Sequence, residues 1–389
     1  MTPAARYAAA IGVLDQVVSG SPAEKALTNW ARKNRYAGSK DRAAVRDHVF
    51  DVLRCKRSCA AYGDGEDGRS LVLGLLRSSG IDPFDVFSGE GYAPQKLSRD
   101  ETNFETPELS QAEAADLPDW AWPLWRAALG DDAFEAAQSQ RQRAPVSLRV
   151  NRAVSSAEEA ILALAEDEIQ VKRHTAVQGC LIVLTNHRRL TQSRAYQNGL
   201  VELQDASSQQ AVLDWPVKKG DRVLDFCAGG GGKSLAIASA HGALVTAHDA
   251  APERMTDLPV RAERAQSTIE TAETAELASL PPFDVIVCDA PCSGSGTWRR
   301  TPDAKWRLSK DDVLDFHRQQ VAILNSAARL LNETGYLIYS TCSVFEAENA
   351  ATVTAFLVQN PLFRSVAEYQ ITPNSEADGF YYSVMKKSG

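Results

Sequence analysis

Apolar positions near the start of the chain recur at spacings of three and four residues, which is the pattern of an amphipathic helix. The spacing holds in two separate stretches, formed by Ala8, Ile11, Leu14 and Val17 and by Val45, Val49, Val52 and Leu53. Ser39, two residues ahead of Asp41, is a residue type that commonly starts a helix. The pattern therefore predicts a helical N-terminal region, then a turn-rich segment over residues 60–105 and a further helix around residues 118–137.

From Arg141 onward the apolar residues gather into short runs separated by polar turns. Residues 146–150 and 180–185 are expected strands, and residues 157–165 are an expected helix. Together they predict a small α/β segment between the helical region and the remainder of the chain.

After Leu203 the two kinds of pattern alternate regularly. The expected strands cover 222–226, 244–248, 283–288 and 335–340, and the expected helices cover 233–241, 252–265, 311–331 and 347–360. Such alternation predicts an open parallel sheet with helices on both faces. The apolar run at 379–386 is expected to add a terminal strand.

The composition is that of a globular protein, with 44% hydrophobic and 24% charged residues, and this excludes a disordered or fibrous chain. The formal net charge of −8 also excludes a uniformly basic nucleic-acid coat protein. The charge is nevertheless uneven, because residues 6–57 hold 11 basic and 5 acidic side chains and residues 141–194 hold 9 basic and 5 acidic ones. A polyanion would be attracted to these two stretches first. An ordinary helical face exposed to solvent could have the same excess of basic residues.

The chain shows no signal-peptide core and no apolar stretch of membrane-spanning length, so we expect a soluble, cytoplasmic protein with reduced thiols. Seven cysteines in such a setting are more often catalytic or metal-binding than disulfide-bonded. The Cys55/Cys59 and Cys288/Cys292 pairs have a spacing seen in zinc sites, but no histidine cluster accompanies them. We therefore expect no metal.

A glycine-rich turn, Gly229–Gly232, lies between the first expected strand of the sheet and the helix after it. A phosphate-binding loop that ended at Lys233 would need a glycine at Cys227, and the dinucleotide-binding pattern would place its third glycine at Ser234 or Leu235. Both patterns fail at these positions, so the turn predicts a different nucleoside ligand.

S-adenosylmethionine fits the residues around this turn. Its ammonium group needs an acceptor such as Asp225 at the strand end, and its ribose hydroxyls need a second carboxylate at the end of the next strand. Asp249 stands there, 24 residues after Asp225. The alternative is that both aspartates only cap helices.

Two cysteines follow the third and fourth strands of the expected sheet. Cys292 comes shortly after Asp289, and Cys342 ends the fourth strand. Ligands bind outside the carboxyl ends of parallel strands, so both thiols are expected in one crevice with the glycine turn. A thiol reacts as thiolate, and Lys233 is a cation that could favour that form. The alternative for any cysteine is a small apolar filler, which we assign to Cys180, Cys227 and Cys288.

Long stretches of the chain resemble the RNA 5-methylcytosine methyltransferase family, which includes the bacterial 16S ribosomal RNA cytosine-C5 enzyme and the NOL1/NOP2/Sun proteins. The resemblance rests on residues 289–306, DAPCSGSGTWRRTPDAKW, and on residues 340–343, STCS, with Glu346, Glu348 and Asn349. Residues 145–389 share it, including Leu148–Asn151 and Gln204–Gln209. Residues 38–54 are similar to the NusB-like helical domain of the ribosomal RNA branch.

The chain departs from the family's pattern in two places. Gly229 and Gly230 stand where the family has Ala-Pro, which makes the cofactor loop more flexible. The stretch 267–279 contains no aspartate, although the family usually has one there for the adenine.

The resemblance implies a Rossmann-like class I methyltransferase domain over 203–389, preceded by a NusB-like helical domain over 1–140 and a small α/β linker domain over 141–202. It implies S-adenosylmethionine as cofactor and carbon 5 of an RNA cytosine as the methylated atom. By the family's assignment Cys342 adds to carbon 6 of the base and Cys292 assists its release. Asp289 would hydrogen-bond the ring edge, supported by Lys233.

The implied cofactor contacts are Asp225, Cys227, Ala228, Gly229, Gly230, Gly231, Gly232, Lys233, Asp249, Arg254 and Asp289. The implied RNA contacts are Arg149, Asn151, Arg299, Arg300 and Lys305. We expect ribosomal RNA as the partner ahead of tRNA, no membrane or metal partner, and a monomer. The alternatives are a tRNA cytosine-C5 methyltransferase and a non-catalytic RNA-binding assembly factor on the same fold.

Overall fold

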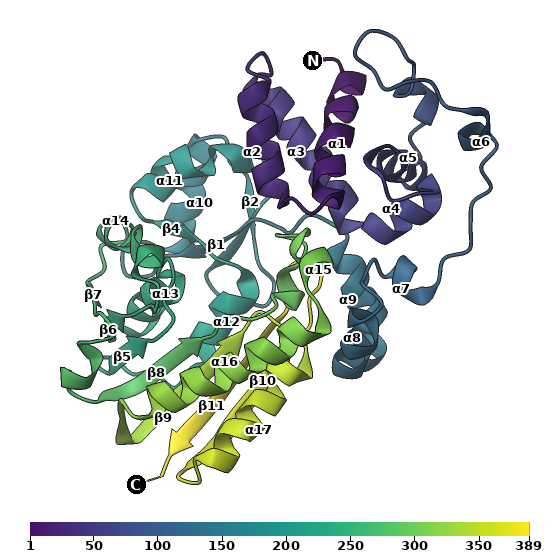
Figure 1. Ribbon diagram of the computed structural model, residues 1–389. Helices are drawn as coiled ribbons and strands as arrows, with labels where there is room; N and C mark the ends of the chain where they lie inside the picture. Colours follow the sequence, from purple (N-terminus) through teal and green to yellow (C-terminus); the bar gives the residue numbers. More distant parts are fainter. Residues whose placement is uncertain (389) are drawn as a thin grey trace. The chain divides into compact units, whose positions relative to one another are not determined.

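The computed structural model describes residues 1–388, which form two compact units (Figure 1). The first unit comprises Met1–Arg126, Gly130–Arg143 and Trp298–Leu308, and the second comprises the rest of the chain. The small α/β segment therefore belongs to the second unit, and an eleven-residue stretch of the methyltransferase-like sequence belongs to the first. The three-domain division stays a prediction.

The first unit is helical, as the spacing of its apolar residues predicts. Its helices are α1 (Pro3–Val18), α2 (Ala23–Lys33), α3 (Ser39–Arg54), α4 (Lys56–Gly63), α5 (Gly68–Ser78), α6 (Arg99–Thr102), α7 (Gln111–Ala114), α8 (Ala121–Leu129), α9 (Ala133–Gln140) and α15 (Ala304–Arg307). Val13, Val49 and Leu71 are fully buried in its core. The helix expected around 118–137 is interrupted at Gly130, whose φ of 56° is left-handed and ends α8.

A small antiparallel sheet opens the second unit. Its strands β1 (Ser147–Val150), β2 (Val171–Arg173), β3 (Cys180–Val183) and β4 (Val201–Leu203) lie in the order β2-β3-β1-β4. Helices α10 (Ala157–Glu166) and α11 (Arg194–Gln197) belong to the same segment, and Leu148, Leu164 and Leu181 form its core.

The main sheet of the second unit has seven strands in the order β10-β11-β9-β8-β5-β6-β7. Their bounds are β5 (Arg222–Asp225), β6 (Leu244–Ala247), β7 (Ile269–Thr271), β8 (Phe283–Asp289), β9 (Leu331–Thr341), β10 (Phe363–Ile371) and β11 (Phe380–Lys387). Five neighbouring strands, β7, β6, β5, β8 and β9, are parallel, whereas β11 runs antiparallel to both β9 and β10. This confirms the predicted Rossmann-like sheet and the terminal strand.

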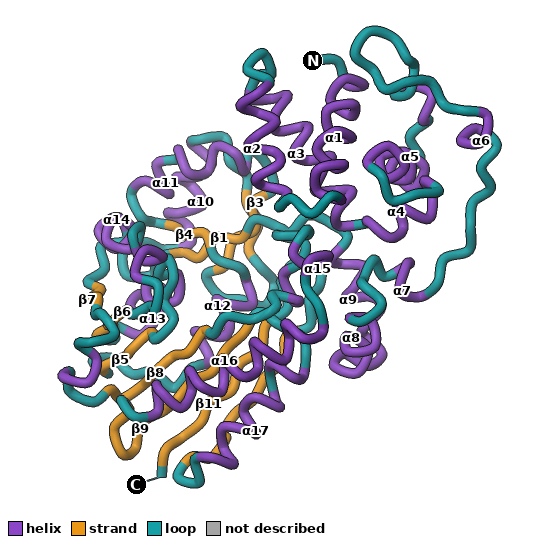
Figure 2. The backbone as a smooth tube through the Cα atoms, viewed as in Figure 1, coloured by secondary structure: helices purple, strands orange, loops and turns teal. Residues whose placement is uncertain are grey.

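Helices cover both faces of this sheet (Figure 2). One face packs its alternate residues, such as Leu224, against α16 (Lys310–Ala328) and α17 (Ala350–Gln359). The other face, which includes Val223, packs against α12 (Ala206–Asp214) and α13 (Gly232–His241). The strand order reverses at β5, because its neighbours are β6 and β8, and open α/β sheets bind ligands at such a point.

The sequence patterns missed four strands, β2 and β4 of the small sheet and β7 and β10 of the main sheet, and they overextended one helix. β7 is short and mostly exposed, and β10 is an edge strand with few buried residues, so neither has a clear apolar signature. The helix expected over 252–265 is divided into a 3₁₀ turn, Pro252–Met255, and α14 (Leu258–Arg264).

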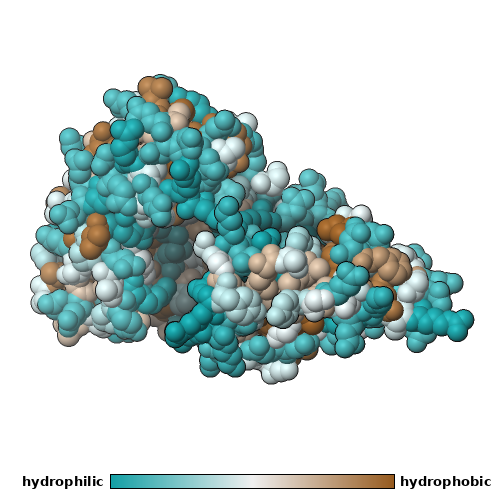
Figure 3. Space-filling model, turned by 90° about the horizontal axis from the view of Figure 1, so that it is seen from above, coloured by the Kyte–Doolittle hydropathy of each residue, from teal (hydrophilic) through white to brown (hydrophobic). Residues whose placement is uncertain are grey.

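The surface in Figure 3 is mainly hydrophilic, with apolar side chains scattered over it. Within residues 1–388, no helix has both the length and the apolar character needed to cross a membrane.

Candidate active site

The glycine turn joins the end of β5 to the start of α13, where the sequence places it. Gly229 and Gly231 have φ angles of 50° and 77°, which are left-handed values that favour glycine. A Cβ at position 231 would also lie 2.1 Å from Cδ1 of Leu258 on α14. The turn can therefore pass close to α14 only with glycine at position 231.

Asp225 ends β5 directly ahead of this turn and is fully buried. Its Oδ2 accepts a hydrogen bond from the Ser234 hydroxyl at 2.7 Å, and its Oδ1 has no hydrogen-bond partner within residues 1–388. Burial raises the pKa of Asp225 to about 6, so the carboxylate is mostly ionised at neutral pH. An ionised, half-satisfied carboxylate at this place is suited to a cationic N–H donor.

Asp249 follows β6, on the other side of the turn, and is also buried. It accepts hydrogen bonds from the backbone N–H groups of Gly229, at 2.9 Å, and Ala251, at 3.0 Å. The guanidinium group of Arg254 lies 3.2 Å from its Oδ2. The second predicted carboxylate thus contacts the glycine turn directly, and Arg261 donates a further hydrogen bond to the carbonyl of Gly230.

The two cysteines predicted to converge do so: the Sγ atoms of Cys292 and Cys342 are 3.4 Å apart. The hydrogen bond from Cys292 lowers the pKa of Cys342 even though burial opposes this, and Lys233 contributes to the lowering. The same hydrogen bond, together with burial, raises the pKa of Cys292. Cys342 is therefore the thiol of the pair that loses its proton more readily.

An ion pair connects the glycine turn to these thiols. Nζ of Lys233, in the first turn of α13, lies 2.6 Å from Oδ2 of Asp289 at the end of β8. Burial alone would lower the pKa of Lys233, but Asp289, with smaller contributions from Asp225 and Cys342, raises the pKa. Asp289 also accepts a hydrogen bond from the Ser340 hydroxyl at 3.1 Å.

Glu348 organises both cysteine loops, a role that the sequence patterns did not assign to it. Its buried carboxylate accepts hydrogen bonds from the N–H and hydroxyl of Ser293, at 2.7 and 2.5 Å, and from the hydroxyl of Ser343, at 2.5 Å. Each serine directly follows one of the two cysteines. The repeated Cys-Ser pair was the available signal, but only the fold shows that one carboxylate binds both serines.

Other predicted cofactor residues lie along the turn. The N–H of Ala228 donates to the carbonyl of His248 at 2.8 Å, and Gly232 begins α13. Burial raises the pKa of Cys227, which leaves that thiol neutral. Asn151 is buried, and its side-chain amide donates to the carbonyls of Ala265 and Gly199 at 2.8 and 3.1 Å. Its environment is therefore that of a structural residue.

The three basic residues predicted beside Cys292 belong to the first unit. Lys305 is buried, and its ammonium group donates to the carbonyls of Arg54 and Asp116 at 2.9 and 2.8 Å. Arg299 is also buried, whereas Arg300 is exposed. This burial does not favour the phosphate contacts predicted for Arg299 and Lys305. Among residues 1–388, no three His, Cys, Asp or Glu side chains are grouped so that they could hold a metal ion.

The sheet and the site at its carboxyl edge define a Rossmann-like methyltransferase domain. Residues 212–386 match the family model described as 16S rRNA methyltransferase RsmB/F, and residues 117–189 match the ferredoxin-like domain of RsmF/B-like methyltransferases. The chain is 32% identical over 306 residues to ribosomal RNA small subunit methyltransferase B of Sodalis glossinidius, which covers 72% of this chain and 68% of the relative. The chain therefore belongs to the RsmB/F methyltransferase family.

A second relative agrees with this family, and a solved structure matches the fold. The chain is 32% identical over 299 residues to ribosomal RNA small subunit methyltransferase B of Pasteurella multocida, an alignment that covers 69% of this chain and spans 65% of the relative's length. The crystal structure of PH0851 matches the fold with a TM-score of 0.77 at 22% identity, over 100% of this chain and 99% of that one.

Proposed function

We propose that the protein transfers the methyl group of S-adenosylmethionine to carbon 5 of a cytosine in RNA, with small-subunit ribosomal RNA as the substrate. The single observation that carries the proposal is the 3.4 Å contact between Cys292 and Cys342. The Lys233–Asp289 ion pair lies beside these thiols, and Lys233 directly follows the glycine turn. The names of the relatives from Sodalis and Pasteurella support ribosomal RNA as the substrate.

The residues around the glycine turn fit S-adenosylmethionine. The unpartnered Oδ1 of Asp225 would accept a hydrogen bond from the ligand's ammonium group, which also offsets the cost of burying that carboxylate. Asp249, next to the turn, would accept hydrogen bonds from the ribose hydroxyls. When bound there, the cofactor supplies an electrophilic methyl group.

The thiol pair supplies the activation that cytosine needs, because carbon 5 is a poor nucleophile. The Cys342 thiolate forms a bond to carbon 6, and the ring electrons then make carbon 5 nucleophilic toward the methyl group. Asp289 binds the ring edge and favours its protonation as the sulfur adds, with Lys233 supporting that charge. The methyl transfer leaves S-adenosylhomocysteine. A water molecule then takes the proton from carbon 5, the C–H electrons re-form the C5–C6 double bond, and the Cys342 sulfur leaves as a thiolate. Cys292 assists this release by donating a hydrogen bond to the departing sulfur.

The assignment of the two cysteines is tested by trapping the covalent intermediate. Wild-type protein, Cys292→Ala and Cys342→Ala are incubated with deproteinised 16S rRNA and methyl-labelled S-adenosylmethionine, and then run on denaturing gels. We expect a stable protein–RNA adduct with Cys292→Ala and none with Cys342→Ala. Cys55→Ala, which changes a thiol in the first unit, is the control and should behave as wild type. An adduct that persists in Cys342→Ala would reverse the assignment.

The RNA class is tested by bisulfite sequencing of 16S rRNA and tRNA from a strain without the gene. The proposal expects one cytosine of the 16S rRNA to lose its protection. Loss at a tRNA cytosine instead would make this a tRNA enzyme, and RNA binding without any label transfer would make it a non-catalytic binding protein.

A further inference from the structure

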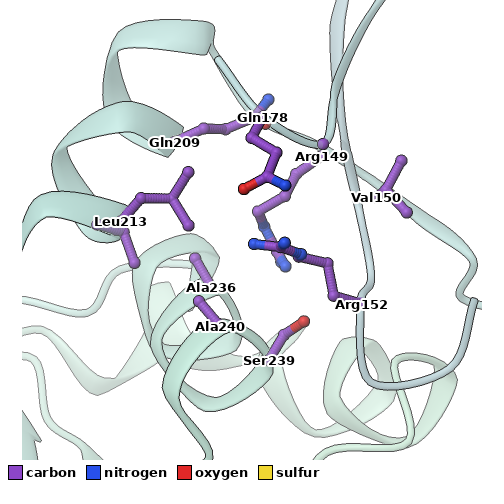
Figure 4. A pocket seen from close by; sticks show the side chains of 11 residues that line it. Arg149, Val150, Arg152, Gln178, Gln209, Leu213, Ala236, Ser239 and Ala240 are labelled. Carbon is purple, nitrogen blue, oxygen red and sulfur yellow. The ribbon is translucent and has the colours of Figure 1, made fainter. Parts of the chain in front are cut away.

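The cavity shown in Figure 4 is too small to be a second ligand site. It lies where β1 and the loop before β3 meet α12 and α13, and Arg149 and Gln209 are among its lining residues. Its volume is about 20 Å³, which is room for one water molecule. Glu202, directly opposite Arg149 in the pairing of β1 with β4, already acts on it as a countercharge. The buried polar groups that bear on the chemistry lie instead next to Cys292.

Gln320 is a fully buried polar residue of α16 that the proposed mechanism does not use. Its Nε2 donates hydrogen bonds to the carbonyl of Pro291 at 3.0 Å and to Oε1 of Glu348 at 3.3 Å. Its Oε1 accepts a hydrogen bond from the hydroxyl of Thr352, on α17, at 3.2 Å. A backbone carbonyl can only accept, so the NH2 group of the amide has to face Pro291, and this contact fixes the orientation of the side chain.

The contacts of Gln320 hold the backbone on both sides of Cys292. Pro291, whose carbonyl accepts from Gln320, directly precedes this cysteine. Ser293 directly follows it, and its N–H donates to Oε1 of Glu348 at 2.7 Å. This is the same carboxylate oxygen that Gln320 contacts. The amide therefore restrains the residue before Cys292 directly and the residue after it through one shared oxygen.

The loop of Cys342 is held in a different way. The hydroxyl of Ser343, the next residue, donates to the other carboxylate oxygen of Glu348, Oε2, at 2.5 Å. The backbone N–H of Ser343 donates to the hydroxyl of Thr341 at 3.2 Å. Among the described residues, Gln320 forms no hydrogen bond with this loop. Loss of the amide should therefore displace Cys292 more than Cys342.

We propose that Gln320 is a positioning residue for Cys292, and thereby for the step that releases the methylated cytosine. This rests on the proposed function, in which Cys292 donates a hydrogen bond to the departing sulfur of Cys342. The two Sγ atoms are 3.4 Å apart, and such a bond weakens steeply as its length and angle depart from their best values. A shift of the Cys292 backbone therefore slows the release more than the attack on carbon 6.

The test follows release in Gln320→Met, which keeps the length of the side chain and removes the amide. Full-length protein is incubated with deproteinised 16S rRNA and methyl-labelled S-adenosylmethionine, and the covalent protein–RNA adduct is followed over time on denaturing gels. We expect the adduct to accumulate and its release rate to fall about tenfold, while the Kd for S-adenosylmethionine stays at the wild-type value. Gln319→Met, at the exposed neighbouring position on α16, is the matched control and should release RNA at the wild-type rate.

Two further variants separate positioning from a general weakening of the fold. Because Gln320 acts through Cys292, Gln320→Met should slow release no further in a protein that already carries Cys292→Ala. Thr352→Val leaves the amide in place and removes the hydroxyl that donates to its Oε1. This variant should cause the same accumulation of adduct to a smaller extent.

The outcomes distinguish this role of Gln320 from the proposed function itself. Release at the wild-type rate in Gln320→Met would overturn the role, and so would a loss of adduct formation in place of slow release. A further slowing in the double variant would also overturn it, because the amide would then act independently of Cys292. If Cys292→Ala itself trapped no adduct, the proposed function would fail, and the role of Gln320 would fail with it.

Discussion

At the scale of single residues, Asp225 places a buried carboxylate with unused hydrogen-bonding capacity in the candidate site. Its carboxylate is fully buried, and it receives one side-chain hydrogen bond, from Ser234, although it can accept several. Burial raises its pKa to about 6, which means that the folded protein binds this proton more tightly than the unfolded chain does. Without a ligand, the ionised form therefore destabilises the fold.

Asp225→Asn should stabilise the ligand-free protein and abolish cofactor binding. The asparagine carries no charge to bury, and it can still accept the Ser234 hydrogen bond. Thermal unfolding at pH 8 is expected to show a higher Tm than wild type, and the difference should shrink as the pH falls through about 6, where the aspartate itself becomes neutral. Calorimetric titration with S-adenosylmethionine should show no binding. An asparagine variant that binds the cofactor normally would remove Asp225 from the site.

The proposed contact between Asp225 and the ammonium group predicts a pH dependence of cofactor binding. Because that contact would need the ionised carboxylate, the Kd for S-adenosylmethionine should rise as the pH falls through about 6. Well below that pH, the Kd should increase about tenfold per pH unit. Isothermal titration between pH 5 and pH 8 measures this, and a flat profile would contradict it.

At the scale of elements, parallel strands explain how much of the site could be read from the sequence. Motifs that follow β5, β8 and β9 must meet at one edge of the sheet, so the convergence of Asp225, Cys292 and Cys342 was predictable. Glu348 and the buried state of Lys305 were not, because both depend on which distant backbone or side-chain groups face them. A count of charges cannot tell a surface lysine from one that donates to two buried carbonyls.

The glycine turn offers a matched pair of substitutions. Gly231→Ala should weaken cofactor binding and destabilise the protein by about 1–3 kcal/mol, because its φ is 77° and the new methyl group would meet Leu258. Gly230→Ala should be tolerated, since the nearest atom to its Cβ, at 3.0 Å, is the end of the flexible Arg261 side chain. Denaturant unfolding and cofactor titration of both variants compare the two effects. If both variants lost the same stability and cofactor affinity, the left-handed backbone at Gly231 would not be what makes glycine necessary in the turn.

Glu348→Gln tests whether the spacing of the two thiols depends on the carboxylate that joins their loops. The amide keeps one acceptor oxygen and has an NH2 donor in place of the other, so either the Ser293 N–H loses its acceptor or both serine hydroxyls have to turn and accept. We expect kcat to fall by about tenfold or more while the Kd for S-adenosylmethionine is unchanged, as a displacement of the thiols would cause. The thiolate absorbance of Cys342 should also titrate at a higher pH. A variant with a normal kcat would make Glu348 dispensable for the positioning of the thiols.

At the scale of the whole molecule, the chain leaves the second unit shortly after Cys292 and returns to it before α16. The stretch between, Trp298–Leu308, carries the buried side chains of Trp298, Arg299 and Lys305. Trp298 stacks on Trp125, with ring centroids 6.1 Å apart, and Lys305 lies over the ring of Trp306 at 4.7 Å. The family resemblance implies that Arg299, Arg300 and Lys305 contact RNA, whereas Arg299 and Lys305 are buried within the first unit.

A fragment that begins at Ala144 should therefore aggregate, because it would expose the two tryptophans of this stretch. The same fragment with residues 298–308 replaced by a short Gly/Ser linker should be more soluble. Size-exclusion chromatography of the two fragments at equal concentration gives the comparison. Equal solubility of the two fragments would show that residues 298–308 do not cause aggregation when the helices of the first unit are absent.

This interleaving has a consequence for how the protein can change over time. A recombination event at one point in the gene cannot exchange the helical unit for another RNA-binding module, because three separate pieces of sequence build it and one of them continues directly from the cysteine loop. New substrate preferences must then arise by point substitutions on the existing surface, and the two units have to be inherited together.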